Sequence, residues 1–600
     1  DVIAALTVAD SALVVVCASS GVEVGTEKSW TYLEDRGMPR TVFVNKMDRE
    51  NANFGKVVEQ LRSFFGPKLV PVQLPIGEAD SFRGIVDLVA MKAYIKDGDS
   101  IKEAPIPEDM QAQVEAARDE MIEAASVADE DLMMKYLEGE ALTDAEIEQA
   151  VRLGTQTGEL VPILCGSAQS TLGISLLNDH IVQCMPSPAN RTVSGTNAQD
   201  EEITISASNP ELAALVYKTM ADPYVGKLTL FRVFSGTMRS DSTCFNVRTG
   251  RDERVGQLFL IKGKEQIPVS KIGPGDLGAV AKLQETTTND TLTTKEAKIS
   301  VKPVEFPKPN MTLAIQPKSK GDEDKIASAL GRLSEEDPTI RVERRTDTGQ
   351  NLIHGMGDVH IEILTSRLQK KFGVEVELST PVVPYRETIR GRAKAEGKHK
   401  KQTGGRGQYG HVWLEISPAD PDAEDRLVFV DDIFGGAVPR NYIPAVEKGL
   451  REILDDGPLA GYPVEGVRVS LFDGSYHPVD SSEMAFKIAA GLAFRKGFLD
   501  ANPVLLEPIM NVEITVPEAF MGDVMGDLNK KRGRILGMEP RGGLQVIKAQ
   551  VPMAEMFKYA IDLRSMTQGR GSFTSEFSHY EEVPAQIAEQ VIAESKKRDE

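Results

Sequence analysis

The chain has 600 residues, 41% of them hydrophobic, which at roughly 100 to 200 residues per domain predicts three to six domains with separate cores. It contains no apolar run of the roughly 18 residues that would span a membrane, and Asp1–Leu6 lack the features of a secretory signal. We therefore expect a cytoplasmic protein with no membrane contact. Its four cysteines form no CxxC pair, which argues against a zinc site or a disulfide framework, and we predict no metal ligands.

The net charge of −21 is unevenly distributed along the chain. Residues 103–148 hold 15 acidic and 2 basic side chains, and we predict that they form an acidic helical insertion. Residues 390–406 hold seven basic side chains and one acidic side chain, Glu396. Charge runs are commonly solvated faces, but a cluster of cations also suits contact with the phosphates of a nucleic acid.

The first elements along the chain indicate a doubly wound α/β sheet. Ala12–Val16 is a short apolar run that suits a buried parallel strand, and a helix containing Trp30 and Leu33 follows it. A second strand, Arg40–Val44, leads directly into a polar loop. Ligands of such sheets bind beyond the carboxyl ends of the strands, so we expect a ligand at this loop.

The loop consists of Asn45, Lys46, Met47 and Asp48, a combination that suits guanine. Guanine offers two adjacent N–H donors, and one carboxylate such as that of Asp48 can accept both. Asn45 can donate to the base or tie neighbouring loops together, and the methylene stem of Lys46 can lie along the flat face of the base. An NKxD string also occurs in ordinary turns, so this motif alone is weak evidence for a guanine site.

A second strand-end loop lies far downstream. Val161–Cys165 is another apolar strand, and a loop of small residues follows it before a helix over residues 173–184. Backbone amides in such a loop can donate to the guanine carbonyl oxygen, a contact that the amine of adenine opposes. The two loops together predict a base-binding site made of Asn45, Lys46, Met47, Asp48, Gly166, Ser167 and Ala168.

The sequence contains no phosphate-binding loop of the form GxxxxGK followed by Ser or Thr. In that loop, backbone amides and the lysine hold the phosphates and the hydroxyl holds Mg²⁺. Each Gly-Lys pair here is followed by a different residue type, namely Val57, Leu228, Glu265 or His399. No DxxG motif precedes the first strand either. We therefore predict a base site with no catalytic residue present.

Gly405, Gly407 and Gly410 form a literal GxGxxG string. A dinucleotide site requires a strand before this string and a helix after it, whereas here a basic stretch precedes it and an alternating strand, His411–Ile416, follows it. We therefore reject a dehydrogenase-type cofactor fold. The glycines are better suited to a sharply folded loop tip that presents Gln408 and Tyr409 outward and can enter RNA.

Several longer strings carry a family resemblance. The chain resembles elongation factor G over nearly all of residues 1–590, through FVNKMDRENANF, CGSA, ADPYVGKLTLFRVFSG, LGRLSEEDPT, GMGDVHIEIL, PYRETIR, GGRGQYGHV, AGYPVEG, GSYHPVDSSEMAFKIAA, PVLLEPIM and LRSMTQGRGSF. The resemblance implies a bacterial-type translational GTPase that uses GTP and, with a complete GTPase domain, Mg²⁺. It also implies that the given sequence is truncated at the N-terminus, and we expect it not to hydrolyse GTP alone.

The fold implied by the resemblance is multidomain, α/β and α+β. It comprises a partial GTPase domain of the P-loop type, a β-barrel, and two ferredoxin-like modules that flank an α+β tip domain. The expected ranges are 1–190 for the GTPase domain with its acidic insertion at about 68–158, 206–305 for the barrel, 308–380 and 508–590 for the two modules, and 381–507 for the tip domain.

The resemblance also implies partners. These are the ribosome, through its RNA and stalk proteins, together with tRNA and mRNA, and the protein is expected to be a monomer. The residues that match the RNA-contacting tip of the family are Gly405, Arg406, Gly407, Gln408, Tyr409, Gly410, Ser475, Tyr476 and His477. Pro478 stands where the family usually has an acidic residue.

The function implied is GTP-dependent translocation of tRNA and mRNA. A ribosomal protection protein and a paralogue used for ribosome recycling or stress are alternatives from the same class. An alternative from another class is a nonenzymatic ribosome-binding fragment.

Overall fold

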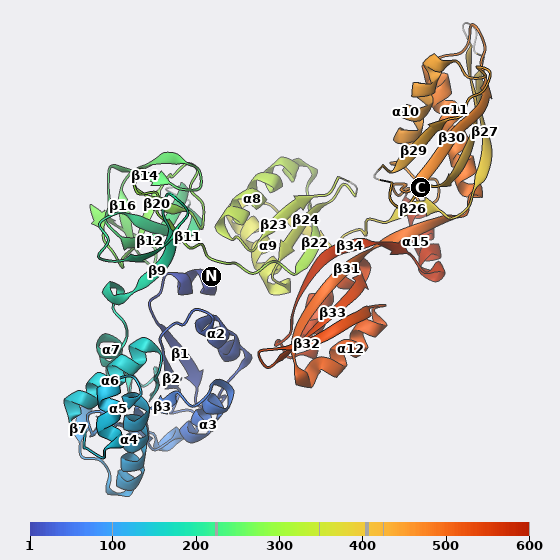
Figure 1. Cartoon of the computed structure of the whole chain (residues 1–600). Coiled ribbons are helices and arrows are strands. Elements are labelled where there is room, and N and C mark those ends of the chain that lie inside the picture. The colour runs from blue at the N-terminus through green and yellow to red at the C-terminus, as the bar shows by residue number, and fades with distance from the viewer. Residues whose placement is uncertain (99, 223–225, 347, 403–406, 424, 599–600) are drawn as a thin grey trace. The chain divides into compact units, whose positions relative to one another are not determined.

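The computed structural model describes residues 1–98, 100–222, 226–346, 348–402, 407–423 and 425–598. The chain forms two compact units, one of Asp1–Pro307 with Gly331–Pro338 and the other of Lys308–Leu330 with Thr339–Glu600 (Figure 1). Within these described ranges, no helix is both long enough and apolar enough to cross a membrane.

The first unit starts with the parallel sheet that the sequence predicts. The sheet has the order β1-β2-β8-β3, and all three neighbouring pairs are parallel. Its strands and the helices beside them are α1 (Val2–Thr7), β1 (Ala12–Cys17), α2 (Val24–Glu34), β2 (Arg40–Asn45), α3 (Phe54–Phe65), β3 (Leu69–Pro71), β8 (Val161–Cys165) and α7 (Ile174–Cys184). β2 and β8 lie in the middle of the sheet, which explains why their residues are apolar and largely buried.

The acidic insertion contains a sheet as well as helices. Its antiparallel sheet has the order β4-β5-β6-β7, and only the acidic stretch that follows is mainly helical. The elements are β4 (Gln73–Ile76), β5 (Gly84–Asp87), β6 (Lys92–Asp97), β7 (Ser100–Ala104), α4 (Gln111–Ser126), α5 (Glu130–Leu137) and α6 (Asp144–Thr157). α6 begins with a capping box at Thr143 and ends at Gly158, whose φ of 76° suits a glycine at a helix end.

Residues 192–301 of the first unit are β structure. A curved sheet of eight strands forms the barrel around an apolar core, with the order β15-β14-β20-β11-β12-β19-β16-β17. A separate sheet has three strands in the order β10-β9-β21. The strands are β9 (Thr192–Thr196), β10 (Glu202–Ser206), β11 (Ala213–Asp222), β12 (Gly226–Ser235), β13 (Met238–Arg239), β14 (Ser242–Asn246), β15 (Arg251–Val255), β16 (Leu258–Lys262), β17 (Glu265–Val269), β18 (Lys271–Ile272), β19 (Leu277–Ala281), β20 (Thr291–Thr293) and β21 (Ser300–Val301).

The second unit contains two modules with the element order β-α-β-β-α-β, and their sheets have the ferredoxin-like strand arrangement. The first consists of β22 (Met311–Pro317), α8 (Glu323–Glu336), β23 (Arg341–Arg344), β24 (Asn351–Gly355), α9 (Asp358–Phe372) and β25 (Val376–Ser379). The second consists of β31 (Pro503–Pro517), α12 (Met521–Lys530), β32 (Arg534–Arg541), β33 (Leu544–Pro552), α13 (Met553–Met556), α14 (Tyr559–Met566) and β34 (Ser572–Glu582), with β26 (Arg386–Ile389) on its sheet and α15 (Ala585–Arg598) after it.

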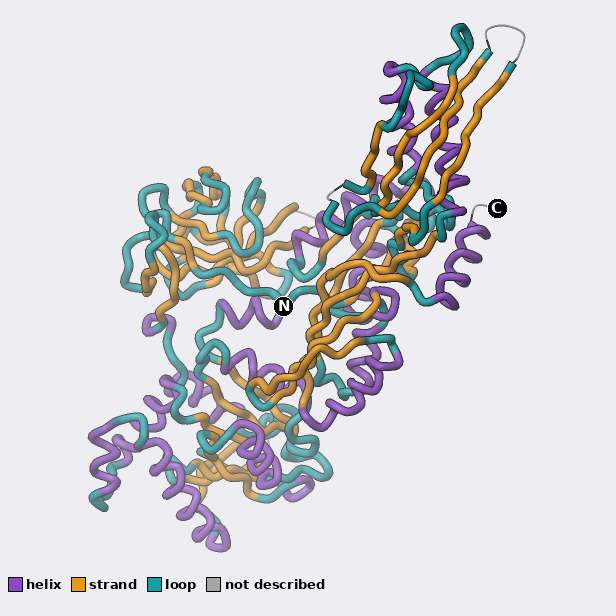
Figure 2. Tube along the Cα trace, turned by 45° about the vertical axis from the view of Figure 1, so that its right-hand side comes forward, coloured by secondary structure: helices purple, strands orange, loops and turns teal. Residues whose placement is uncertain are grey.

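An α+β domain lies between the two modules in the sequence. Its sheet has the order β27-β28-β30-β29, and α10 and α11 pack on it over a core that includes Phe486, Phe494 and Phe498. The elements are β27 (Ala393–Lys401), β28 (Gln408–Pro418), β29 (Leu427–Asp431), α10 (Ile443–Ile453), β30 (Val467–Ser475) and α11 (Glu483–Asp500). Figure 2 shows the long strands of this sheet ending at loops, which we call the tip end of the domain.

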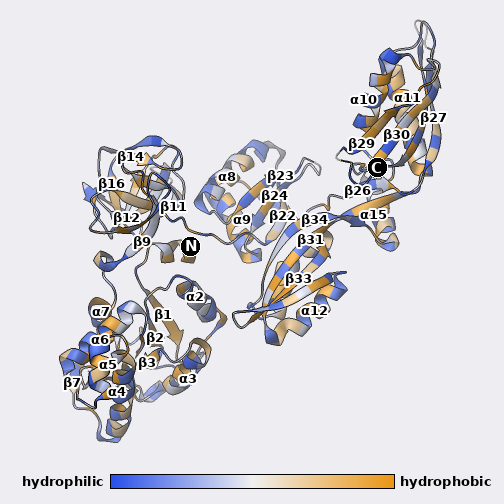
Figure 3. Ribbon diagram, viewed as in Figure 1, coloured by the Kyte–Doolittle hydropathy of each residue, from blue (hydrophilic) through white to orange (hydrophobic). Residues whose placement is uncertain are grey.

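The hydropathy of the residues differs between the parallel sheet and the acidic insertion. Strand β1 is coloured largely hydrophobic in Figure 3, whereas the helices of the acidic insertion alternate between apolar and polar residues. The strands of the parallel sheet share one hydrophobic core with the insertion. The strand-end loops are therefore attached to a well-packed hydrophobic core.

Candidate functional site

The two loops predicted to bind a base are joined directly in the structure. Asn45 ends β2, and its side-chain Oδ1 accepts hydrogen bonds from the backbone N–H of Lys46 at 2.8 Å and of Ala168 at 2.9 Å. The backbone N–H of Met47 donates to the carbonyl of Gly166 at 3.2 Å. Of the two roles predicted for Asn45, the structure shows the one that ties neighbouring loops together.

The backbone gives each loop a fixed shape. Lys46 has a φ of 63°, a left-handed conformation that turns the chain out of the strand and leaves its side chain exposed. Met47 and Ser167 are fully buried, so they anchor the two loops in the protein interior. Asp48 is partly exposed and Ala168 is exposed, which leaves the carboxylate and the small-residue loop accessible to a ligand.

The tip end of the α+β domain brings together most of the other predicted residues. Gly405 and Arg406 lie outside the described residues. Gln408 is exposed, as expected, and its Oε1 lies 2.9 Å from Nε2 of His399 across the β27–β28 pair. Tyr409 differs from the expectation of an outward side chain, because it is only partly exposed and its hydroxyl lies 2.8 Å from Ser475 Oγ.

Asp480 joins the two predicted tip loops, although the motifs did not single it out. Its Oδ1 accepts the backbone N–H of Gly407 at 3.0 Å, and its carbonyl accepts the N–H of Tyr409 at 2.8 Å. The Nδ1 of His477 accepts the backbone N–H groups of Val479 at 3.3 Å and of Asp480 at 3.1 Å. The same nitrogen lies 3.3 Å from Asp480 Oδ2, and the imidazole ring is half-exposed.

The basic stretch before the tip divides into two parts. At the end of the domain opposite the tip, Arg390 pairs with Glu582, and both Arg392 and Lys394 pair with Glu415. Nearer the tip, three lysines are exposed, and these are Lys398, Lys400 and Lys401. The cations closest to the tip are therefore the ones best placed to meet a phosphate.

The two described glycines of the GxGxxG string, Gly407 and Gly410, serve packing. A Cβ on Gly407 would lie 2.9 Å from the carboxyl carbon of Asp480, and a Cβ on Gly410 would lie 2.3 Å from the carbonyl oxygen of Ala485 in α11. Gly410 therefore lets β28 lie directly against the helix. Strand β28 begins at Gln408, within the string, and continues beyond Gly410 where a dinucleotide site would need a helix, which agrees with rejection of such a site.

We expect Gly410→Ala to destabilise the α+β domain by about 1–3 kcal/mol, because neither the strand nor the helix backbone can yield easily. Hydrogen exchange in β28 and α11 measures this loss. The matched control is Gly491→Ala in α11, whose Cβ would meet only the Ile453 side chain at 3.6 Å and which should be neutral or slightly stabilising. Equal protection in both variants would contradict this prediction.

Comparison with known proteins accounts for nearly the whole chain. Five family models match in sequence order: Elongation factor Tu GTP binding domain at residues 1–187, Elongation factor G domain 2 at 211–295, Elongation Factor G domain III at 306–380, Elongation factor G domain IV at 381–502 and Elongation factor G C-terminus at 504–591. A crystal structure of a Thermus thermophilus protein, ttk003000868, is 38% identical, with a TM-score of 0.79, and the match covers 99% of this chain and 87% of that chain.

The chain belongs to the elongation factor G family. It is accordingly a translational GTPase of the elongation factor G type, a class that binds guanine nucleotide, usually with Mg²⁺, and acts on the ribosome. The two loops predicted to bind a base place an accessible carboxylate beside a small-residue loop. Among the described residues, no three His, Cys, Asp or Glu side chains are grouped so that they could hold a metal ion.

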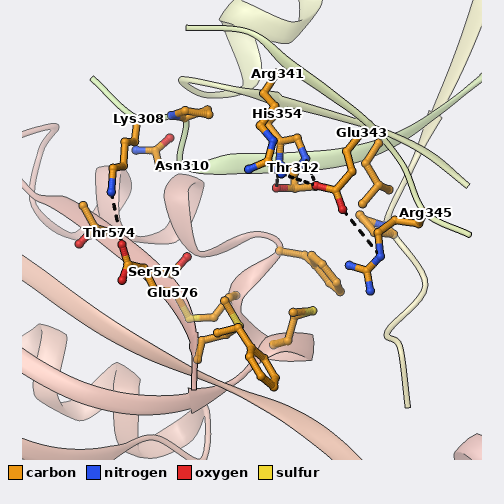
Figure 4. Close-up of a pocket in the computed structure, with 18 of the residues that line it drawn as sticks. Lys308, Asn310, Thr312, Arg341, Glu343, Arg345, His354, Thr574, Ser575 and Glu576 are labelled. Carbon is orange, nitrogen blue, oxygen red and sulfur yellow. Dashed lines mark hydrogen bonds and ion pairs between the residues drawn. The ribbon is translucent and has the colours of Figure 1, made fainter. Parts of the chain in front are cut away.

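The protein also contains a cavity that no sequence motif indicated. It has a volume of about 650 Å³ and is lined by both ferredoxin-like modules (Figure 4). On one side Lys308 lies 3.3 Å from Glu576, and on the other Thr312 Oγ1 lies 2.9 Å from Nδ1 of His354. Burial lowers the pKa of His354, which favours its neutral form in this hydrogen bond.

Proposed function

We propose that this protein uses GTP hydrolysis to move tRNA and mRNA on the ribosome. The observation that carries the proposal is the tip, where Asp480 holds two loops together and leaves His477 and Gln408 exposed. Short polar side chains of this kind can contact the ribose hydroxyls and phosphates of RNA without selecting a base sequence. That property suits a factor that serves every codon.

The tip residues proposed to contact RNA are Gly407, Gln408, Tyr409, Gly410, Ser475, Tyr476 and His477. We further propose that the factor is a cytoplasmic monomer, and that its five domains follow the order expected from the sequence, with β26 and the whole of β31 assigned to the last ferredoxin-like module. The acidic helices α4 to α6 are proposed to meet the ribosomal stalk proteins. The exposed carboxylates of these helices support an electrostatic contact of this kind.

For the nucleotide, we propose that Asp48 accepts the two N–H donors of guanine, that Ala168 and its neighbours face the carbonyl oxygen, and that Lys46 covers the base. Most nucleotide affinity in this class comes from the phosphate-binding loop and Mg²⁺. Since the given sequence contains no such motif, we propose that this stretch alone does not hydrolyse GTP.

The test compares this chain with a fusion in which a phosphate-binding segment from an elongation factor G precedes Asp1. We call the fusion the phosphate-complete protein. It should hydrolyse GTP in the presence of ribosomes and advance mRNA by one codon per cycle, whereas the chain alone should do neither. Rapid measurement of phosphate release and of mRNA movement on programmed ribosomes gives both readouts.

His477→Ala in the phosphate-complete protein should slow mRNA movement more than about tenfold and leave ribosome-stimulated GTP hydrolysis within about twofold of the parent, because the tip lies on a different domain from the nucleotide loops. Asp420→Asn, an exposed change at the opposite end of the same sheet, is the control. Hydrolysis without mRNA movement in the parent itself would instead favour a recycling or protection role. Binding without hydrolysis would favour a nonenzymatic role.

A further inference from the structure

A third loop at the tip end carries the most exposed large apolar side chain among the described residues. Phe434 is 93% exposed and lies on the loop that follows β29, over residues 432–440. Gly435 and Gly436 come directly after it with φ angles of 67° and 75°, a left-handed pair that turns the chain sharply. The backbone therefore holds the ring away from the core.

Strand direction places this loop at the same end of the sheet as the loop that carries His477. β29 runs parallel to β30, so both strands end at the tip end of the sheet. Val438 is buried against Gly474, since a Cβ at that glycine would lie 2.6 Å from Val438 Cγ2. The hydroxyl of Tyr442, just beyond the loop, donates to the carbonyl of Ser481 at 3.3 Å. The third loop is thus anchored on the loop that carries His477.

The charges near Phe434 are of both signs. Asp431 and Asp432 precede the ring, but Asp431 Oδ1 accepts the N–H of Ile433 at 3.1 Å and Asp432 Oδ2 accepts the hydroxyl of Ser470 at 2.5 Å. Each carboxylate thus accepts a hydrogen bond within its own domain, and both side chains stay exposed. Arg440 lies at the far end of the loop, and the three exposed lysines of β27 lie at the other edge of the same sheet.

We propose that Phe434 stacks on an unpaired RNA base when the tip engages RNA on the ribosome. This inference rests on the proposed function and adds a third contact to it. A flat ring with exposed faces suits a base, because every base has a π face and stacking tolerates any sequence. Such a contact adds affinity without base selection, as the proposed function requires.

The test uses the phosphate-complete protein and ribosomes that carry tRNA and mRNA, with a nonhydrolysable GTP analogue. Phe434→Ala should weaken binding roughly 5- to 150-fold, the range expected for loss of one stacked base. Phe434→Trp should bind at least as tightly as the parent. Phe434→Leu, which keeps an apolar side chain but no ring, should bind as weakly as the alanine variant.

Three outcomes separate this inference from the proposed function. If His477→Ala weakens binding and Phe434→Ala does not, the stacking inference is overturned and the proposed function stands. If Phe434→Leu binds like the parent, the contact is an apolar one with protein and the RNA assignment is wrong. If neither Phe434→Ala nor His477→Ala changes binding or mRNA movement, the tip assignment itself fails. The ring is almost fully exposed, so these variants should fold normally.

Discussion

Asp48→Asn in the phosphate-complete protein is expected to lower affinity for GTP roughly 100-fold, while creating measurable affinity for XTP. The carboxylate of Asp48 can accept both N–H donors of guanine, whereas an amide offers one donor and one acceptor. Xanthine has a carbonyl where guanine has its amine, so it matches the amide. Titration of the two nucleotides against wild type and variant measures the change in preference.

The control for this substitution is Glu50→Gln, which removes an exposed carboxylate close to the same loop. It should leave both affinities within about twofold, because Glu50 is not among the residues predicted to contact the base and the effect of a single solvent-exposed charge is small. An Asp48 variant that keeps its preference for GTP over XTP would show that the base lies elsewhere. The loops joined by Asn45 would then be only a structural connection.

Glu387→Ala is expected to destabilise the second unit by about 3–5 kcal/mol, because a buried acceptor is lost. Glu387 on β26 is fully buried, and its carboxylate accepts the backbone N–H groups of Leu459 at 2.9 Å, Ala460 at 2.7 Å and Tyr462 at 3.0 Å. Alanine would leave all three N–H groups without this partner. Calorimetric unfolding should show a lower transition temperature for this unit.

Glu387→Gln provides a graded comparison, since it keeps one acceptor oxygen in the same place. We expect a smaller loss than for alanine. Gly457 lies directly against the carboxylate, since a Cβ there would lie 2.3 Å from Glu387 Oε2. In the glutamine variant, water therefore has little room to replace the lost carboxylate oxygen. If alanine and glutamine variants unfolded at the parental temperature, the carboxylate would not be what holds this loop.

The same residue predicts a pH dependence. Burial raises the pKa of Glu387 above its usual range, and the three backbone N–H donors offset this only in part. A raised pKa means that the folded state binds the proton more tightly than the unfolded state. Its stabilising contribution is then complete below the usual glutamate pKa and is lost as pH rises through the folded value.

The stability advantage of the parent over Glu387→Gln should therefore shrink as pH rises above the usual glutamate pKa of about 4.3 and through the raised pKa of the folded state, because glutamine does not titrate. Chemical unfolding of both proteins across this range gives the difference at each pH. An advantage that grows with pH would mean that the N–H donors outweigh burial and hold the carboxylate ionised.

The sequence by itself determined the local elements and the family. Arg40–Val44 is apolar because a strand inside a parallel sheet is buried on both faces, and the structure confirms this strand. Ala12–Val16 also forms a strand, but the prediction that it is buried was wrong, because β1 lies at the edge of the sheet and leaves Leu13 and Val15 exposed. The rejection of a dinucleotide site also depended only on which elements flank the glycines. Strand and helix signals are short-range, so they can be read from neighbouring residues.

Only the tertiary structure decided which distant residues meet. Asn45 reaches Ala168 across 123 positions, Asp480 reaches Gly407 across 73, and Glu387 reaches Ala460 across 73. None of these pairs has a local signal, because each depends on strand order and packing. The inward turn of Tyr409, the sheet within the acidic insertion and the exposure of Phe434 are decided in the same way, since a residue's burial depends on what the rest of the chain packs against it.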